Sequence, residues 1–153
     1  GRIGKKMIHT GDTGTQWGIS KEELMERISE SAKATADHFG DHIAYINVLR
    51  NMSVSCDCEG TAAQPVVTPN IGILASTDIL AADQASVDLV YALPEKYRHD
   101  LVERMETRHG LRQLSYMKEL GMGCDRYVIL DMDHGDTPIT LAEAVKNVKP
   151  FKA

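Results

Sequence analysis

The sequence predicts an α/β fold with a layered, mostly parallel sheet flanked by helices. Three apolar runs have the length of β-strands, at 43–49, 71–76 and 127–130. Helical patterns lie before, between and after these runs, at 20–39, 78–93, 95–109, 111–120 and 141–148. Strands that alternate with helices are typical of layered α/β proteins. We therefore expect about three strands and about five helices.

Composition restricts the class of protein. The chain has 153 residues, of which 42% are hydrophobic, which suits one compact domain. Its 17 basic and 22 acidic residues give a net charge of −5, so the basic surface of a nucleic-acid binder is not expected. No apolar run approaches the roughly 20 residues of a membrane span. Three cysteines are too few for a disulfide scaffold, and we expect a reduced, cytoplasmic protein.

Residues 1–19 are predicted to be a Gly/Thr-rich loop, and residues 20–153 the α/β core. At the centre of the loop stand His9, Thr10 and Gly11. Backbone N–H groups of a glycine-rich loop can hold an anion, which makes these three residues candidate cofactor contacts. The segment matches no phosphate-binding fingerprint, and a flexible loop is the alternative interpretation.

The first helix has signals at both of its ends. Ser20 and Glu23 form a capping box, in which each side chain satisfies the backbone N–H of the other. Gly40 follows the last apolar position, as glycine does after many helices. The apolar stripe of this helix consists of Leu24, Ile28, Ala32, Ala36 and Phe39. Such a stripe is expected to pack in the core.

The next elements are predicted from apolar runs and caps. The run 43–49 shows no alternation of polar and apolar residues, as in a parallel strand buried on both faces. After the second run, Ser76 or Thr77 is expected to cap a helix, with Asp78 in its first turn. Thr140 and Glu143 form a second capping box, which opens the last helix.

The tripeptide Cys56-Asp57-Cys58 is the strongest candidate for a functional site. In an extended segment, residues two apart project to the same side, so both sulfurs can bind one soft metal ion. Zinc and iron–sulfur sites normally need four ligands, which leaves this motif half of a site. Cys124 can complete it only if the preceding loop reaches the same end of the sheet. The alternative is a pair of partly buried structural thiols.

Carboxylates supply the other candidate ligands. Asp83 lies between small alanines, and a carboxylate there needs a partner if it is buried. We name Cys56, Cys58 and Asp83 as candidate metal ligands, with structural pairing as the alternative role for Asp83. A hard-metal site has only one local candidate, the aspartates near His134, which also fit a simple turn: Asp131, Asp133 and Asp136.

Several segments together resemble a known family. They read, in chain order, Lys6 to Thr10, Tyr45-Ile46-Asn47-Val48, Cys56-Asp57-Cys58, Ile71 to Asp78, Ala82-Asp83-Gln84-Ala85, Asp88-Leu89-Val90 and Glu119 to Gly123. In this order they resemble the domain of unknown function 362 family, bacterial and archaeal proteins often labelled iron–sulfur-centre proteins. The resemblance covers most of residues 5–132. Many members carry a ferredoxin-like C-x2-C-x2-C-x3-C module, which this chain lacks.

The resemblance implies that residues 1–153 are the C-terminal half of a larger α/β domain. The expected partner is then the N-terminal half of the same protein or another copy of the chain. Two functions remain open. The first is metal or cofactor binding, through a transition metal or iron–sulfur centre, with a redox role for the Cys-x-Cys motif. The second is a non-catalytic binding or assembly module with structural cysteines.

Overall fold

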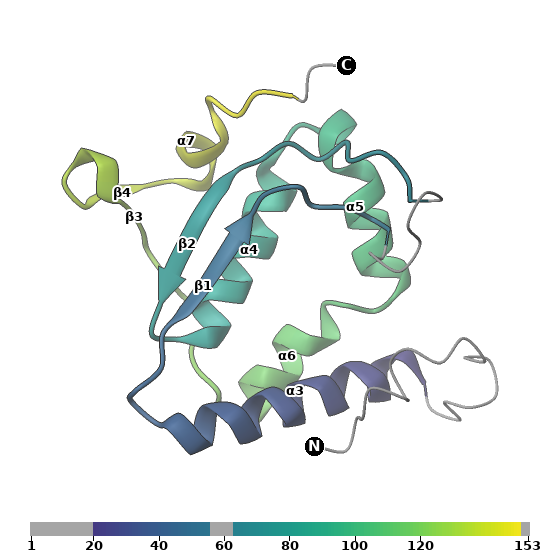
Figure 1. Ribbon diagram of the computed structural model, residues 1–153, viewed down its shortest axis with the longest axis vertical. Helices are drawn as coiled ribbons and strands as arrows, with labels where there is room; N and C mark the ends of the chain where they lie inside the picture. Colours follow the sequence, from purple (N-terminus) through teal and green to yellow (C-terminus); the bar gives the residue numbers. More distant parts are fainter. Residues whose placement is uncertain (1–19, 56–62, 151–153) are drawn as a thin grey trace.

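The computed structural model describes residues 20–55 and 63–150. Figure 1 shows their arrangement as a mixed α/β fold with five helices and two small sheets. The helices are α3 (Lys21–Phe39), α4 (Ile79–Ala92), α5 (Glu95–Thr107), α6 (Arg112–Glu119) and α7 (Leu141–Val145). The strands are β1 (Tyr45–Leu49), β2 (Gly72–Ser76), β3 (Ile129–Asp131) and β4 (Thr137–Ile139), with a 3₁₀ turn at Met132–His134. The predicted number of helices is confirmed, whereas the described residues form four strands instead of about three.

The predicted parallel sheet was wrong, because both sheets are antiparallel pairs of strands. In the first, β1 pairs with β2 so that Tyr45 lies opposite Ser76 and Leu49 opposite Gly72. In the second, the short strands β3 and β4 form a hairpin. The absence of alternation in the first strand indicated burial on both faces, but only the inner face is covered. The apolar outer residues are exposed: Ile46, Val48 and Ile73.

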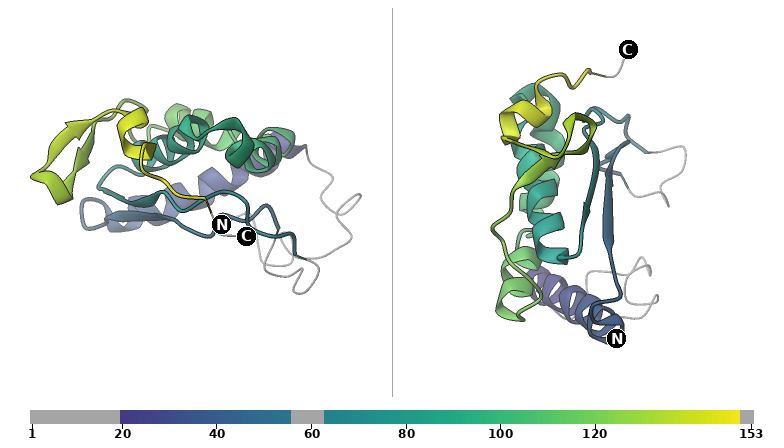
Figure 2. Two further views of the ribbon diagram at one scale, coloured as in Figure 1. Left: turned by 90° about the horizontal axis from the view of Figure 1, so that it is seen from above. Right: turned by 90° about the vertical axis from the view of Figure 1, so that its left-hand side faces the viewer.

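Helix α4 occupies the centre of the described structure. It contacts both strands of the β1–β2 sheet as well as α5, α6 and α7. Figure 2 shows the sheet covering one side of α4 and the other helices lying around it. Leu80 is completely buried and Leu89 is 2% exposed, whereas α5 contributes no fully buried residue. The apolar core is therefore built around this helix.

Helix α3 packs along α6 at one edge of the fold (Figure 1). Arg112 joins the two helices, since its guanidinium contacts Glu26 on α3 and Glu119 on its own helix. Ser29, only 1% exposed, donates its hydroxyl to the backbone oxygens of Met25 and Gln113. A small buried residue at this position lets the two backbones approach closely.

Most predicted helix caps are confirmed, and one differs. Ser20 accepts from the backbone N–H of Glu23 at 3.1 Å, and Thr140 and Glu143 form the complete reciprocal box. The cap of α4 is Asp78, rather than Ser76 or Thr77, because its carboxylate accepts from the N–H of Ala81 at 2.9 Å.

Within residues 20–55 and 63–150, no helix is long and apolar enough to cross a membrane.

Substitution of Leu80 by alanine tests the central role of α4. Removing a side chain with no exposed surface leaves a cavity, so the free energy of unfolding should fall by about 2–5 kcal/mol. The matched control is Leu111→Ala, since Leu111 is 38% exposed and should cost less than about 1 kcal/mol. Urea denaturation measures both values. Equal losses for the two variants would contradict a core centred on α4.

Candidate functional site

A cavity of about 510 Å³ lies between α5 and the two chain segments that flank residues 56–62. One wall belongs to α5, and the other to residues 54–55 and 64–67. Ser55 Oγ accepts from the backbone N–H of Gln64 at 2.8 Å, which ties these segments together. The lining residues are Val54, Ser55, Gln64, Pro65, Val67, Asp100, Glu103, Arg104 and Thr107. Cys56 follows Ser55 directly in the sequence, so this cavity adjoins the start of the Cys-x-Cys segment.

The α5 wall of the cavity is polar and charged. Asp100, Glu103, Arg104 and Thr107 have the spacing i, i+3, i+4 and i+7, which places them on one face of the helix. The two carboxylates and the guanidinium can contact cationic and anionic groups of a ligand, respectively. The sequence analysis missed these residues. Their helical spacing was the available signal, but a charged helical face is more often simply solvated.

The other predicted site residues lie mostly outside the described ranges. This holds for the cysteines Cys56 and Cys58 and for the loop residues His9, Thr10 and Gly11. In the part of the chain that the structure describes, no three His, Cys, Asp or Glu side chains are grouped to hold a metal ion. The described residues thus do not supply a complete set of metal ligands by themselves.

Asp83 lies on α4, facing β1, and is half-buried. The side-chain amide of Asn47 on β1 donates to Asp83 Oδ1 at 2.8 Å and to Ser86 Oγ at 2.9 Å. Ser86 in turn donates to the backbone oxygen of Ala82 at 2.7 Å. The carboxylate therefore has the partner that burial demands. Whether Asp83 also ligates a metal with Cys56 and Cys58 stays a prediction.

Cys124 lies at the opposite end of the sheet from Ser55. Its backbone N–H donates to Asp78 Oδ2 at 2.8 Å, and Asp78 follows the end of β2 that pairs with Tyr45. Ser55 instead follows Leu49, at the other end of β1. Cys124 therefore lies away from Ser55, while a shared site with Cys56 and Cys58, which lie outside the described residues, stays a prediction. Its exposed thiol accepts a weak contact from the N–H of Arg126, at 3.5 Å.

Asp88 makes a further polar tie that the sequence analysis missed. Its carboxylate accepts from Gln84 Nε2 at 2.9 Å and from the hydroxyl of Tyr127. Burial, followed by the hydrogen bond to this carboxylate, raises the pKa of Tyr127 well above its usual range. The phenol therefore stays protonated at physiological pH and fastens the segment before β3 to α4.

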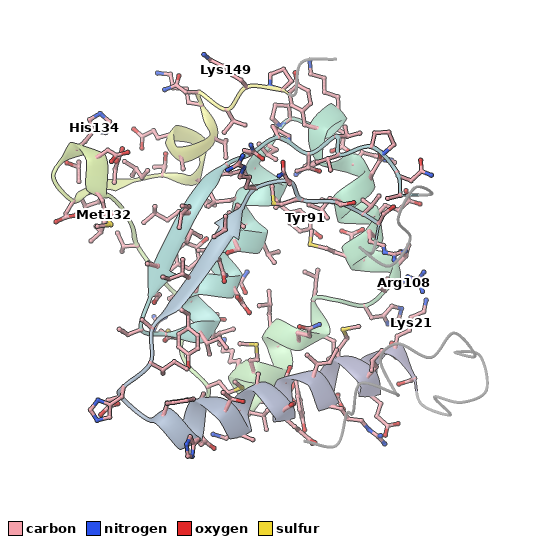
Figure 3. The ribbon with its side chains drawn as sticks, viewed as in Figure 1. Lys21, Tyr91, Arg108, Met132, His134 and Lys149 are labelled. Carbon is pink, nitrogen blue, oxygen red and sulfur yellow. The ribbon has the colours of Figure 1, made fainter. Side chains whose placement is uncertain are left out.

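The aspartates around His134 form a turn in the β3–β4 hairpin. Asp131 Oδ1 accepts from the backbone N–H of Asp133 at 3.0 Å, and its Oδ2 lies 2.8 Å from His134 Nδ1. Figure 3 shows His134 at the outer end of this hairpin. The Asp131 carboxylate raises the pKa of His134, while His134 lowers the pKa of Asp131. The turn interpretation of this acidic segment is thus the one that fits.

Substitution of Gly123 by alanine tests the tie between Asp78 and the loop before Cys124. A Cβ at Gly123 would lie 2.0 Å from Asp78 Oδ1, so the carboxylate would have to give up its backbone hydrogen bonds. Gly121 is a partial control, because it also has positive φ (+68°, against +152° at Gly123) but open space around its Cβ. We expect Gly123→Ala to lower the free energy of unfolding by about 1–2 kcal/mol more than Gly121→Ala. Similar losses in urea denaturation would show that the tie contributes nothing.

The pair Asp131–His134 gives a prediction for pH. Because the pKa of His134 is raised above 6.5, the pair stabilises the fold below that value. This stabilisation is lost as pH rises through the folded-state pKa. In Asp131→Asn, which can keep the cap on Asp133, NMR titration should show a lower pKa for His134. The pKa of His99, which is raised by Asp100, should not change and serves as internal control. An unchanged His134 pKa would contradict the pairing.

Comparison with known proteins assigns the chain to a family. Curated protein sequences and solved structures gave no match. The family described as Domain of unknown function (DUF362) matches residues 1–88. The match covers the N-terminal part of this chain and stops short of the expected extent to residue 132. It does not support the expectation that residues 1–153 are the C-terminal half of the family's domain. It includes β1, the Cys-x-Cys segment, β2 and most of α4. Because more than half of the chain is matched, the protein belongs to the Domain of unknown function (DUF362) family.

Proposed function

We propose that this chain binds a transition metal or a metal-containing cofactor through the thiolates of Cys56 and Cys58, in a redox role. The observation that carries the proposal is the cavity of about 510 Å³ beside this segment. Ser55 and Gln64, on either side of the cysteines in sequence, both line it and are hydrogen-bonded to each other. A ligand in the cavity would therefore lie next to the point where the Cys-x-Cys segment begins.

The available donors suit a metal with mixed ligands. Thiolates favour soft or borderline ions, and of these iron and copper can change oxidation state, as a redox role requires, whereas zinc cannot. Carboxylates can fill the remaining positions. Asp83 is the carboxylate named from the sequence, and among the described residues its Oδ2 has no hydrogen-bond partner. Asp100 and Glu103 in the cavity wall are further carboxylates close to the start of the segment. In this proposal the chain supplies two sulfurs and at least one oxygen.

The loop residues His9, Thr10 and Gly11 complete the proposal as contacts for an anionic part of the cofactor. Support for their role comes from composition, since glycine-rich backbone can present several N–H groups to one anion. Their segment belongs to the family match, as do both cysteines and Asp83. If these residues form one site, that site lies within the part of the chain that the family matches.

A second candidate function is the non-catalytic assembly module. It is favoured by the outer face of the β1–β2 sheet, which leaves three large apolar side chains exposed: Ile46 at 65%, Val48 at 55% and Ile73 at 69%. Exposed apolar patches of this kind mark surfaces that contact another protein. The partner is either another part of the same protein or a second copy of the chain.

Metal analysis of the full chain, purified without oxygen, tests the first proposal. We expect close to one metal ion per chain, lost in Cys56→Ser and Cys58→Ser and weakened in Asp83→Asn. The matched control is Cys124→Ser, which removes an exposed thiol at the other end of the sheet and should keep the metal. Circular dichroism verifies that each variant is folded. A metal-free protein that also resists reconstitution, or equal metal loss in the Cys124 variant, would overturn the proposal.

A further inference from the structure

We propose that the β3–β4 hairpin of one copy of this chain docks on the β1–β2 sheet of a second copy. In this contact Met132 enters a cavity at the end of the sheet and Asp133 faces Arg50. The inference rests on the second candidate function, the assembly module, and names its partner. Its four supports are an apolar face, a cavity, an apolar hairpin and complementary charge.

The receiving surface is apolar and ends in a cavity. Val48 and Ile73 are opposite each other in the strand register, and both project from the outer face of the sheet. They also line a cavity of about 210 Å³ where β1 ends and β2 begins. Gly72 also lines this cavity, but it pairs with the buried Leu49 and so belongs to the inner side of the sheet, whereas Val48 and Ile73 belong to the outer face. The face and the cavity are thus one continuous surface.

The hairpin presents a matching apolar edge. Val128, Leu130 and Met132 are spaced two residues apart and are 69%, 50% and 80% exposed. Leu130 lies in β3, Val128 comes just before this strand, and Met132 begins the 3₁₀ turn after it, so the three exposed side chains follow one arm of the hairpin to its tip. Figures 1 and 2 show the hairpin extending outward beyond the β2 side of the molecule, and Figure 3 shows Met132 near its outer end. The unbranched, flexible side chain of methionine adapts readily to an irregular cavity.

Charge complementarity selects a second copy as the occupant. Arg50 lines the cavity at the end of the sheet and has no ion-pair partner among the described residues. In the hairpin, Met132 stands between Asp131 and Asp133. Asp131 already contacts His134, whereas the Asp133 carboxylate has no hydrogen bond within the described residues. If Met132 docks beside Arg50, the Asp133 carboxylate of one copy therefore comes close to the Arg50 guanidinium of the other.

The same contact can be made twice in a symmetric pair. Each copy carries one hairpin and one receiving sheet, so a twofold axis lets both hairpins dock at once. A closed pair would cover both sets of exposed apolar side chains and leave no open end for further growth. The proposed assembly is the closed dimer, and growth beyond the dimer as concentration rises would show an open chain of copies instead.

Sedimentation velocity and light scattering over a range of protein concentrations test the dimer. The full chain should show a concentration-dependent dimer. Met132→Ser, which removes the inserted side chain, should weaken association at least about tenfold. Arg50→Glu should do the same, and adding Asp133→Lys should restore association by reversing both charges. The matched control is Arg108→Glu, an exposed charge reversal outside both surfaces, which should leave the dimer intact.

The outcomes separate the docking mode from the assembly function. If Ile73→Lys abolishes association but the hairpin and cavity variants do not, the sheet assembles by another contact and hairpin docking is overturned. A chain that stays monomeric at the highest concentration reached overturns self-association, including the dimer. Failure of Arg50→Glu with Asp133→Lys to recover association would contradict the proposed charge pairing. Unfolding curves of each variant exclude loss of the fold as the cause.

Discussion

The structure depends on the burial of α4. Leu80 and Leu89 on this helix have almost no exposed surface, and both strands of the β1–β2 sheet and three other helices contact it. A two-stranded sheet is marginally stable by itself and needs an apolar partner on one face. Helix α4 supplies that partner for the inner face of β1 and β2. The position of the sheet, and hence of the cavity at its end, follows from this contact.

Three aspartates, one at the N-terminal cap of α4 and two within the helix, accept hydrogen bonds from neighbouring segments. Asp78, Asp83 and Asp88 are five residues apart, so successive side chains are rotated by about 140° around the helix axis. Each therefore reaches a different segment. Asp78 holds the backbone of Cys124, Asp83 holds Asn47 on β1, and Asp88 holds Tyr127 before β3. Apolar burial fixes where α4 lies, and these hydrogen bonds fix how the neighbouring segments are oriented around it.

This arrangement separates the two candidate functions in space. The cavity beside the Cys-x-Cys segment is bounded by the charged face of α5, while the exposed apolar side chains lie on the outer face of β1 and β2. Metal binding and assembly can therefore occur in one chain without competing for the same side chains. Cys124, at the other end of the sheet, belongs to neither surface and is held by its backbone rather than by its thiol.

The sequence by itself determined the helices and most of their caps, because these depend on residues within a few positions of each other. Ser20 with Glu23 and Thr140 with Glu143 are local signals, and both caps are present. Only the tertiary structure decided the direction of the strands and the face that stays exposed. An apolar run such as 45–49 has the same pattern whether its outer face packs against protein or is open to solvent. Likewise, the approach of α5 to Ser55 and Gln64 joins segments far apart in the chain, and no local pattern encodes such a contact.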